Sequence, residues 1–345
     1  MGDLLRTIRL IGAGRLLQLF RGFRGMQDVM LGYYTTRAMQ ALFNVGFFDE
    51  VRDRGRVDPD AFAKEHNLDP DVLKPICDSL FSLRILTKEA GGYGLDARGR
   101  TLVGVARGWF IATYGYEDVI HSLESLLRRE KEYGRDVHRR IESVTEGYAE
   151  MEQWVFFPWA FEIVSRNGFK RVLDLGCGDG TFLRALCERD GQVTGYGVDL
   201  SPPAIAEGKR KTEAAGLGGR IQLVVGDISK RDQLPDALKG IDVATTFFVL
   251  HELMFHGPDR VVELLRGFRA AFPGVPLVVF EVMRPTPEAL RKRPGMGVVY
   301  FLHHDLTHQK PVGREEWRAV FKEAGFSSIE EIDLWFARTV IFTVR

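Results

Sequence analysis

The segment from Val172 to Thr181, VLDLGCGDGT, constrains the fold more than any other part of the chain. Its apolar beginning predicts a buried strand, and its three glycines at alternate positions predict a sharp turn into a helix. Glycine lets the backbone approach a ligand closely, which a Cβ atom would prevent. Strands and helices alternate from Lys170 onward, so we expect a mostly parallel, doubly wound α/β sheet with helices on both faces.

Acidic residues stand at matching places on three consecutive predicted strands. Asp174 precedes the glycine turn, Asp199 ends the strand that follows about 20 residues later, and Asp227 ends the third strand. A single acid of this kind is often only a helix N-cap. Three in register favour a binding site, in which Asp174 suits a cation, Asp199 suits ribose hydroxyls and Asp227 suits an adenine amino group. The G-x-G-x-G spacing also differs from the G-x-G-x-x-G loop that binds a pyrophosphate.

This pattern resembles the S-adenosylmethionine (SAM) binding motif of class I methyltransferases. The resemblance implies a Rossmann-like, seven-stranded domain and SAM as cofactor. The predicted strands at 329–334 and 339–344 agree, because their short connection requires the antiparallel hairpin that ends such a sheet. The cofactor-binding residues that we expect are Asp174, Gly176, Gly178, Asp199, Leu200, Gly226, Asp227, Ile228 and Thr246.

The chain of 345 residues is long enough for two domains. We expect a helical, winged-helix domain at 1–110, a helical linker that roofs the pocket at 111–168, and the SAM-binding domain at 169–345. The candidate recognition helix, residues 70–84, carries Asp71 and Asp78 beside its basic residues, so it lacks a phosphate-seeking face. We therefore interpret the first domain as a homodimerisation module; the aromatic-rich linker could equally be ordinary packing between domains.

The overall charge argues against a nucleic-acid partner. Lysines plus arginines number 47, as do aspartates plus glutamates, so the formal net charge is zero. The three cysteines show no CxxC spacing, which favours a reducing cytoplasm over a disulfide framework. Arginines interrupt the apolar residues of 1–25, which excludes a signal peptide. That segment could lie on a membrane surface, but a partner subunit is the favoured interpretation, so we expect a cytoplasmic protein without membrane contact.

Two groups of histidines suggest where the chemistry occurs. His251 follows the predicted fourth strand, where the N/D-P-P-Y/F element of nucleic-acid amine methyltransferases is absent. His303, His304 and His308 follow the fifth strand, and the loops after neighbouring strands lie side by side in this fold. A helix over 298–310 would put His304 and His308 on one face, with His303 turned away.

Two families of methyltransferase resemble the chain in this region. The plant-type and polyketide O-methyltransferases resemble it over nearly its whole length, and they carry His-Asp-Trp with the histidine as general base. Here the sequence is His251-Glu252-Leu253, a departure from that pattern. The chain also resembles the α-keto acid C-methyltransferases of peptide-antibiotic biosynthesis, which include phenylpyruvate and 2-ketoarginine methyltransferases. That resemblance implies a metal ion, iron or zinc, bound by His251 and by a histidine about fifty residues later, for which His303 is the first choice.

The second resemblance implies SAM-dependent methylation of the β carbon of an α-keto acid, in the biosynthesis of a non-proteinogenic amino acid. A metal would stabilise the enolate as a Lewis acid. The candidates for the base are Glu252, His304 and a metal-bound hydroxide, and the numerous aromatic residues favour an apolar substrate side chain. Arg135 is our candidate partner for the substrate carboxylate, with a surface salt bridge as the alternative. An O-methyltransferase is the alternative function, and a DNA-binding regulator without catalysis is disfavoured by the neutral charge.

Overall fold

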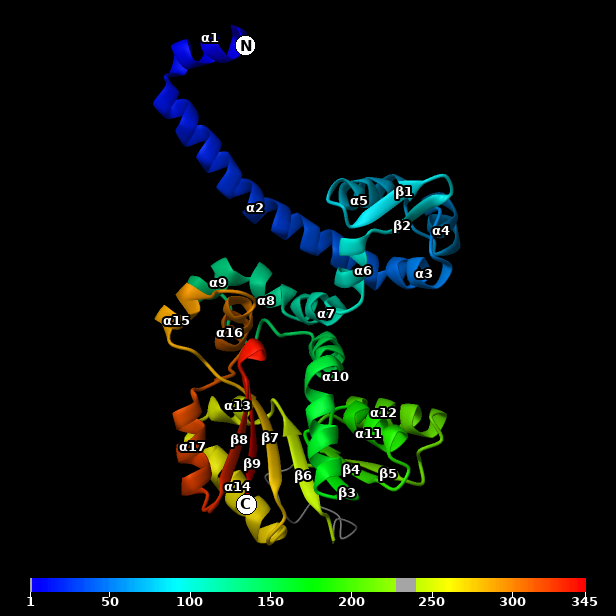
Figure 1. Cartoon of the computed structure of the whole chain (residues 1–345), viewed down its shortest axis with the longest axis vertical. Helices are drawn as coiled ribbons and strands as arrows, with labels where there is room; N and C mark the ends of the chain where they lie inside the picture. Colours follow the sequence, from blue (N-terminus) through cyan, green and yellow to red (C-terminus); the bar gives the residue numbers. More distant parts are fainter. Residues whose placement is uncertain (1, 228–239) are drawn as a thin grey trace. The chain divides into compact units, whose positions relative to one another are not determined.

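A seven-stranded sheet forms the centre of residues 115–345 in the computed structural model, which describes residues 2–227 and 240–345 (Figure 1). The strand order is β5-β4-β3-β6-β7-β9-β8. The first five strands of this order are parallel, and β9 runs antiparallel to both β7 and β8. The strands are β3 (Arg171–Leu175), β4 (Thr194–Asp199), β5 (Ile221–Val225), β6 (Val243–Phe247), β7 (Leu277–Val282), β8 (Ile329–Leu334) and β9 (Thr339–Val344). This confirms the predicted seven-stranded α/β fold.

The strand order reverses beside β3, which pairs with β4 on one side and with β6 on the other. Crevices at such a switch point, outside the carboxyl ends of the strands, are where doubly wound sheets bind ligands. The glycine turn follows β3 directly. The topology therefore brings the ends of β3, β4 and β6 together around the turn.

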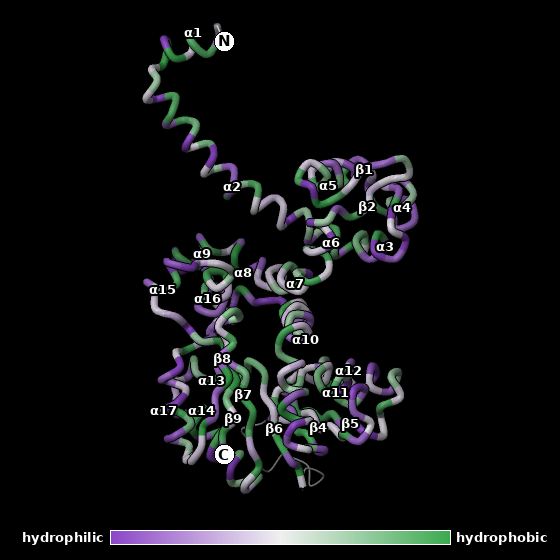
Figure 2. The backbone as a smooth tube through the Cα atoms, in the orientation of Figure 1, coloured by the Kyte–Doolittle hydropathy of each residue, from purple (hydrophilic) through white to green (hydrophobic). Residues whose placement is uncertain are grey.

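Both faces of the sheet are covered, because alternate side chains of each strand point to opposite faces. Leu173 and Val279 belong to one buried apolar cluster, whereas their neighbours Val172 and Val278 belong to another. Figure 2 shows the central strands β7 and β9 as largely hydrophobic. The helices of this unit are α8 (Glu117–His121), α9 (Leu123–Leu127), α10 (Ile141–Arg166), α11 (Thr181–Arg189), α12 (Pro202–Ala214), α13 (Leu250–Met254), α14 (Pro258–Ala271), α15 (Pro287–Lys292), α16 (Gly297–Leu306) and α17 (Arg314–Glu323), with the short 3-10 helix η3 (Trp335–Ala337) between β8 and β9.

Residues 1–114 form a unit of their own. Asp58 and Asp69 cap two helices with their side chains, and a two-stranded hairpin follows, which is the order expected for a winged helix. The unit has its own apolar core around Phe47, Phe62 and Leu80. Its elements are α1 (Gly2–Ile11), α2 (Ala13–Asn44), α3 (Phe47–Arg54), α4 (Pro59–Glu65), α5 (Pro70–Ser82), β1 (Leu86–Glu89), β2 (Gly92–Leu95), α6 (Ala97–Val103) and α7 (Arg107–Gly115), the last of which reaches into the second unit. Residues 115–168, most of the linker predicted at 111–168, belong to the same compact unit as the sheet, and their role as a pocket roof stays a prediction.

The helices α1 and α2 expose many large apolar side chains. Phe20, Phe23 and Val29 are 61%, 55% and 69% exposed. Among the described residues, no helix has the length and apolar character needed to cross a bilayer. These side chains are therefore available for contact with another surface.

Candidate active site

The glycine turn adopts a backbone that other residues would strain. Gly176, Gly178 and Gly180 all have positive φ, at 76°, 55° and 74°. A Cβ atom on Gly176 would also lie only 2.5 Å from Cγ2 of Val249, in the loop after β6. The turn thus needs glycine for its conformation and for its close packing.

Asp199, at the end of β4, is tied to this turn. Its carboxylate accepts hydrogen bonds from the backbone N–H of Gly178 at 2.8 Å and of Ser201 at 2.8 Å. Its backbone carbonyl accepts from Gly226, which links the ends of β4 and β5. The carboxylate therefore lies beside the glycine turn, and its contact with a ribose stays a prediction.

The other expected cofactor residues are distributed around the same strand ends. Leu200 is exposed, and Asp227 lies two residues beyond the end of β5. Thr246 on β6 is buried, and no described residue hydrogen-bonds its hydroxyl. Ile228 lies outside the described residues.

Asp174 is a buried acid with one hydrogen-bond partner. Its carboxyl is 2% exposed and accepts a hydrogen bond from the Thr245 hydroxyl at 2.8 Å. Burial raises the pKa of Asp174 to about 7; the Thr245 hydrogen bond counteracts part of this shift, and the negative charge of Asp199 adds to it. A cation bound beside Asp174 would favour its ionised form.

His251 is the second residue of α13 and is hydrogen-bonded to Glu281 of β7. The imidazole Nδ1–H donates to Glu281 Oε2 at 2.9 Å, and the backbone N–H of His251 donates to Oε1 at 3.2 Å. Both side chains are buried, at 2% and 0% exposure. This arrangement fixes the ring and leaves Nε2 with its lone pair when the imidazole is neutral. Glu281 is absent from the residues predicted from the sequence, although an acid within the apolar run LVVFEV was a usable signal.

His304 is the histidine that the fold places beside His251. The two ring centroids are 5.0 Å apart, and His304 Nδ1–H donates to the backbone carbonyl of Tyr300 at 2.7 Å. Burial, with a smaller contribution from His251, lowers the pKa of His304 well below its usual value. His304 is therefore neutral at physiological pH and, like His251, leaves Nε2 unused.

His303, the first choice from spacing, is oriented differently. Its ring stacks on Tyr116, with centroids 4.2 Å apart and an interplanar angle of 13°. Consecutive residues on a helix point about 100° apart, so only one of His303 and His304 can face His251. Of the expected residues, the structure thus brings His304 next to His251 in place of His303, and the metal pair itself stays a prediction.

The predicted pairing of His304 with His308 is wrong. Helix α16 ends at Leu306, and His308 has a φ of 55°, which places it beyond the helix. Its ring instead stacks on Phe255, with centroids 4.6 Å apart. The i, i+4 relation between the two histidines is lost because the helix stops before His308.

Glu252, a candidate for the base, accepts hydrogen bonds from two polar side chains. Its Oε1 accepts from Arg139 Nη2 at 2.7 Å and from Gln309 Nε2 at 2.6 Å. Arg139 Nη1 is buried and has no hydrogen-bond partner among the described residues. The positive charge of Arg139 also acts on His304. Arg139 thus offers one unused donor near the histidine pair.

Arg135, our candidate for the substrate carboxylate, lies on the surface. Its guanidinium binds Glu132 and Asp136, each at 2.8 Å, and its side chain is 66% exposed. The alternative of a surface salt bridge is what the structure shows. Both arginines lie in the polar stretch before α10, and no sequence signal distinguished Arg139 from Arg135.

The histidine pair fits a metal ion in the character of its donors. A ligating histidine usually donates its second ring N–H to a carboxylate or a backbone carbonyl, and His251 and His304 do so to Glu281 and Tyr300. Among the described residues, the one group of three potential ligands within reach of each other is elsewhere, at Glu50, Glu65 and His66. A metal here would therefore take two protein ligands and leave positions for substrate or water.

Comparisons with known proteins agree with the fold and the glycine turn. Residues 172–271 match a family model described as "Methyltransferase domain". The chain is 28% identical over 304 residues to a 2-ketoarginine methyltransferase of Streptomyces arginensis, covering 85% of this chain and 86% of that protein. It is 33% identical over 171 residues to an indolepyruvate C-methyltransferase of Streptomyces griseus, covering 48% of each.

Solved structures include a similar fold over almost the whole chain. The structure of the mitomycin 7-O-methyltransferase MmcR has a TM-score of 0.67 at 18% identity, and the alignment covers 96% of this chain and 99% of that one. This likeness concerns the fold. The matched methyltransferase domain and the similarity to the Streptomyces methyltransferases show that the chain is a SAM-dependent methyltransferase.

Proposed function

We propose that this enzyme methylates the β carbon of an α-keto acid, and that His251 and His304 hold an iron or zinc ion for this reaction. The observation that carries the proposal is the pair of buried rings whose Nδ1 atoms are both hydrogen-bonded and whose Nε2 atoms have no hydrogen-bond partner among the described residues. The similarity to two enzymes named for keto-acid substrates supports it. The product would serve the biosynthesis of a non-proteinogenic amino acid.

The residues around the histidine pair suit an α-keto acid. A bound metal would supply Lewis acidity at the keto group and so make the β C–H more acidic. The unused Nη1 of Arg139 would bind the substrate carboxylate, while Glu252 and Gln309 orient the guanidinium.

The methyl transfer itself is a simple displacement. A base removes the β proton, the β carbon attacks the methyl carbon of SAM, and the C–S bond breaks with its electron pair passing to sulfur. Glu252 shares Oε1 between two donors, which suits it to orienting Arg139 rather than to taking this proton. The glycine turn holds SAM so that this attack is in line.

Aromatic side chains surround His304 and favour an apolar substrate side chain. The ring of Tyr300 stacks on His304 with centroids 3.9 Å apart, and Tyr116 and Tyr148 both lie 6.4 Å from it. Burial raises the pKa of all three phenols, so they remain neutral at physiological pH.

A small-molecule O-methyltransferase is the second candidate, and the His251–Glu281 pair favours it. A histidine oriented by a buried carboxylate is the arrangement of a general base that takes the proton of a phenol or alcohol. In that case His304 would be a packing residue and no metal would be required.

Metal analysis with two histidine variants distinguishes these reactions. We expect purified enzyme to contain iron or zinc and to methylate an apolar α-keto acid such as phenylpyruvate. His304→Gln should lose both the metal and the activity, whereas the neighbouring His303→Gln should keep the metal. Metal-free enzyme that methylates phenols and ignores keto acids would contradict the proposal and support the O-methyltransferase.

We also propose that the enzyme is a homodimer formed through the N-terminal unit. The exposed side chains of Phe20 and Phe23 on α2 provide the apolar surface that such an interface buries. Light scattering on the full-length protein should give twice the mass of one chain. The double variant Phe20→Glu with Phe23→Glu should give a monomer, and a monomeric wild-type enzyme would refute the assignment.

A further inference from the structure

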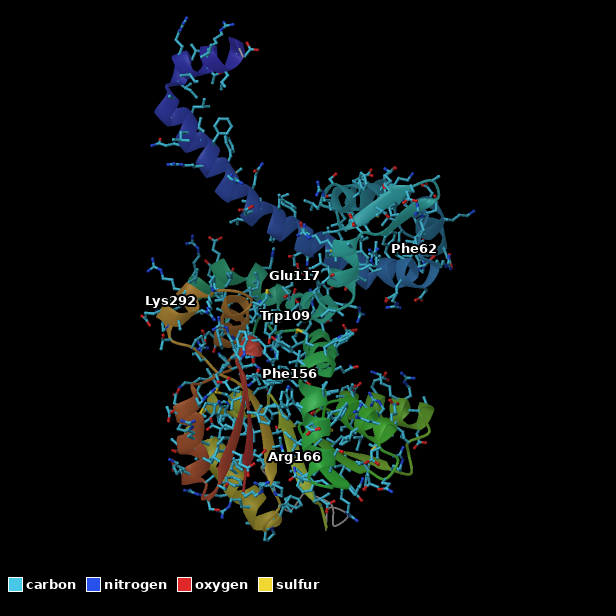
Figure 3. The ribbon with its side chains drawn as sticks, viewed as in Figure 1. Phe62, Trp109, Glu117, Phe156, Arg166 and Lys292 are labelled. Carbon is cyan, nitrogen blue, oxygen red and sulfur yellow. The ribbon has the colours of Figure 1, made fainter. Side chains whose placement is uncertain are left out.

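One side of α10 faces the cofactor turn and the histidine pair at the same time. Thr145 packs toward the turn, since a Cβ atom on Gly178 would lie 3.6 Å from Thr145 Cγ2. Tyr148 lies 6.1 Å from Tyr300 between ring centroids. Phe156, labelled in Figure 3, lies 4.9 Å from Phe248 in the loop after β6.

Glu152 lies on this same side of the helix, since it is four residues from both Tyr148 and Phe156. Asp174 of β3 and Tyr300 of α16 both interact electrostatically with Glu152. Glu152 is therefore within electrostatic range of both the end of β3 and the histidine helix α16. No motif in the sequence distinguishes it from the other glutamates of α10.

The carboxyl group of Glu152 has no hydrogen bond and no ion pair with any side chain or backbone group in the described residues. Asp174 is bound by the Thr245 hydroxyl, and Asp199 accepts two backbone N–H groups. Burial, with the negative charge of Asp174, raises the pKa of Glu152 well above its usual value. A carboxyl without a partner next to a second acid is unfavourable unless a ligand provides the missing cation.

SAM carries its positive charges in its methionyl part, which we expect to lie beside Asp174. The methionyl ammonium has three N–H donors and is bound well by carboxylates, whereas the sulfonium has none. We propose that Glu152 is a cofactor-binding residue, whose carboxylate accepts a hydrogen bond from the methionyl ammonium of SAM. Helix α10 then contributes directly to the SAM site, which the glycine motif alone does not complete.

This role depends on the bound cofactor and not on the identity of the methyl acceptor. The proposed role of Glu152 and the proposed keto-acid activity can therefore fail separately, because binding of SAM can be measured without any acceptor present. The product S-adenosylhomocysteine keeps the ammonium and loses the sulfonium charge. 5′-Methylthioadenosine keeps the adenosine and lacks the whole amino-acid part.

Calorimetric titration of the full-length protein with these three ligands tests the proposal. We expect Glu152→Gln to weaken the binding of SAM and of S-adenosylhomocysteine by a similar factor of about ten or more, because a charge-assisted hydrogen bond is lost. Binding of 5′-methylthioadenosine should change less than about twofold. Glu162→Gln, which neutralises an exposed glutamate of the same helix, is the matched control and should leave all three affinities unchanged.

Three results would overturn the assignment. Unchanged SAM affinity in Glu152→Gln would show that the carboxyl does not contact the cofactor. A loss for SAM without a loss for S-adenosylhomocysteine would assign Glu152 to the sulfonium instead. A loss confined to the KM of the acceptor would place Glu152 in the acceptor site. The thermal midpoint of the ligand-free variant should be no lower than that of wild type, which excludes misfolding as the cause.

Discussion

The proposed cofactor half and the proposed acceptor half of the active site are built in different ways. Most of the cofactor half comes from successive strand ends of one stretch, from Asp174 to Asp227, and its geometry depends on glycines and backbone N–H groups. Glu152 of α10 and Thr246 of β6 add to it from outside this stretch. The acceptor half joins side chains that are far apart in sequence: His251 to Glu281, 30 residues apart, and Arg139 to Glu252, 113 residues apart. The cofactor half is formed mainly by residues that are close together in the sequence. The acceptor half is formed by residues that only folding brings together.

The largest effect in the cofactor half is expected from Gly176→Ala. The new Cβ would require a φ near 76° and would lie 2.5 Å from Val249, so both conformation and packing oppose it. We expect the free energy of unfolding to fall by about 2 kcal/mol or more, and SAM binding to be abolished. Thermal unfolding with and without SAM measures both effects.

Gly191→Ala is the control for this change, because no atom lies within 4 Å of the Cβ that it would add. It should leave SAM binding intact. Normal SAM affinity in Gly176→Ala would show that the turn can relax, and that the cofactor half is less rigid than its geometry indicates.

In the acceptor half, the largest expected loss follows from Glu281→Gln. The amide can no longer accept both hydrogen bonds of His251 as an ionised carboxylate does, so the imidazole loses its orientation. We expect kcat to fall by about 10- to 100-fold, with the metal content reduced if the ion is bound as proposed. SAM affinity should not change.

Glu330→Gln provides the comparison, since Glu330 is an exposed acid of β8 that binds Arg345. A fall in SAM affinity as large as the fall in kcat would argue against the separation of the two halves. Steady-state kinetics and calorimetry on the same preparations make the distinction.

A smaller effect on activity is expected from Arg139→Lys, which changes the proposed substrate-binding residue of the acceptor half. Arg139→Lys keeps the positive charge but loses the fork of N–H donors, so Nη1 can no longer bind a carboxylate. We expect the KM for the keto acid to rise by about tenfold, with a lesser change in kcat. Arg135→Lys should be neutral, because Arg135 is paired on the surface. Equal effects of the two variants would remove Arg139 from the site.

The two halves also differ in how far the sequence predicts them. The strands at 329–334 and 339–344 have the predicted bounds, and the glycine turn lies where its spacing placed it, because strand periodicity and turn chemistry act over a few residues. His251 could be predicted as a site residue because the loop after the fourth strand has a fixed position in this type of sheet.

The remaining acceptor residues required information that one sequence does not contain. The choice between His303 and His304 depends on the rotation of α16 about its axis, which tertiary packing sets and spacing does not. Glu281 and Arg139 act through partners on other elements, so their roles follow from distances rather than from motifs. Glu152 has no hydrogen-bond or ion-pair partner among the described residues, so only its surroundings distinguish it.

The smallest predicted effect is a pH dependence that separates the two halves once more. Asp174 keeps its proton up to about pH 7 in the folded protein, whereas its unfolded value is near 3.8. Between these values the folded state binds more protons, so the free energy of unfolding contributed by Asp174 falls as pH rises toward and through 7. SAM favours the ionised carboxylate, so its affinity should rise over the same range, by at most about tenfold per pH unit.

Asp174→Asn should remove most of this dependence in both measurements, because asparagine can still accept the Thr245 hydrogen bond but does not titrate. Its ligand-free stability above pH 7 should exceed that of wild type, while its SAM affinity is low and nearly constant. Glu152→Gln should likewise reduce the pH dependence of stability and of SAM affinity relative to wild type, since the pKa of Glu152 is also raised. Parallel curves for wild type and both variants would mean that the two acids do not form the cation site, and that the cofactor half binds SAM through its backbone and Asp199 alone.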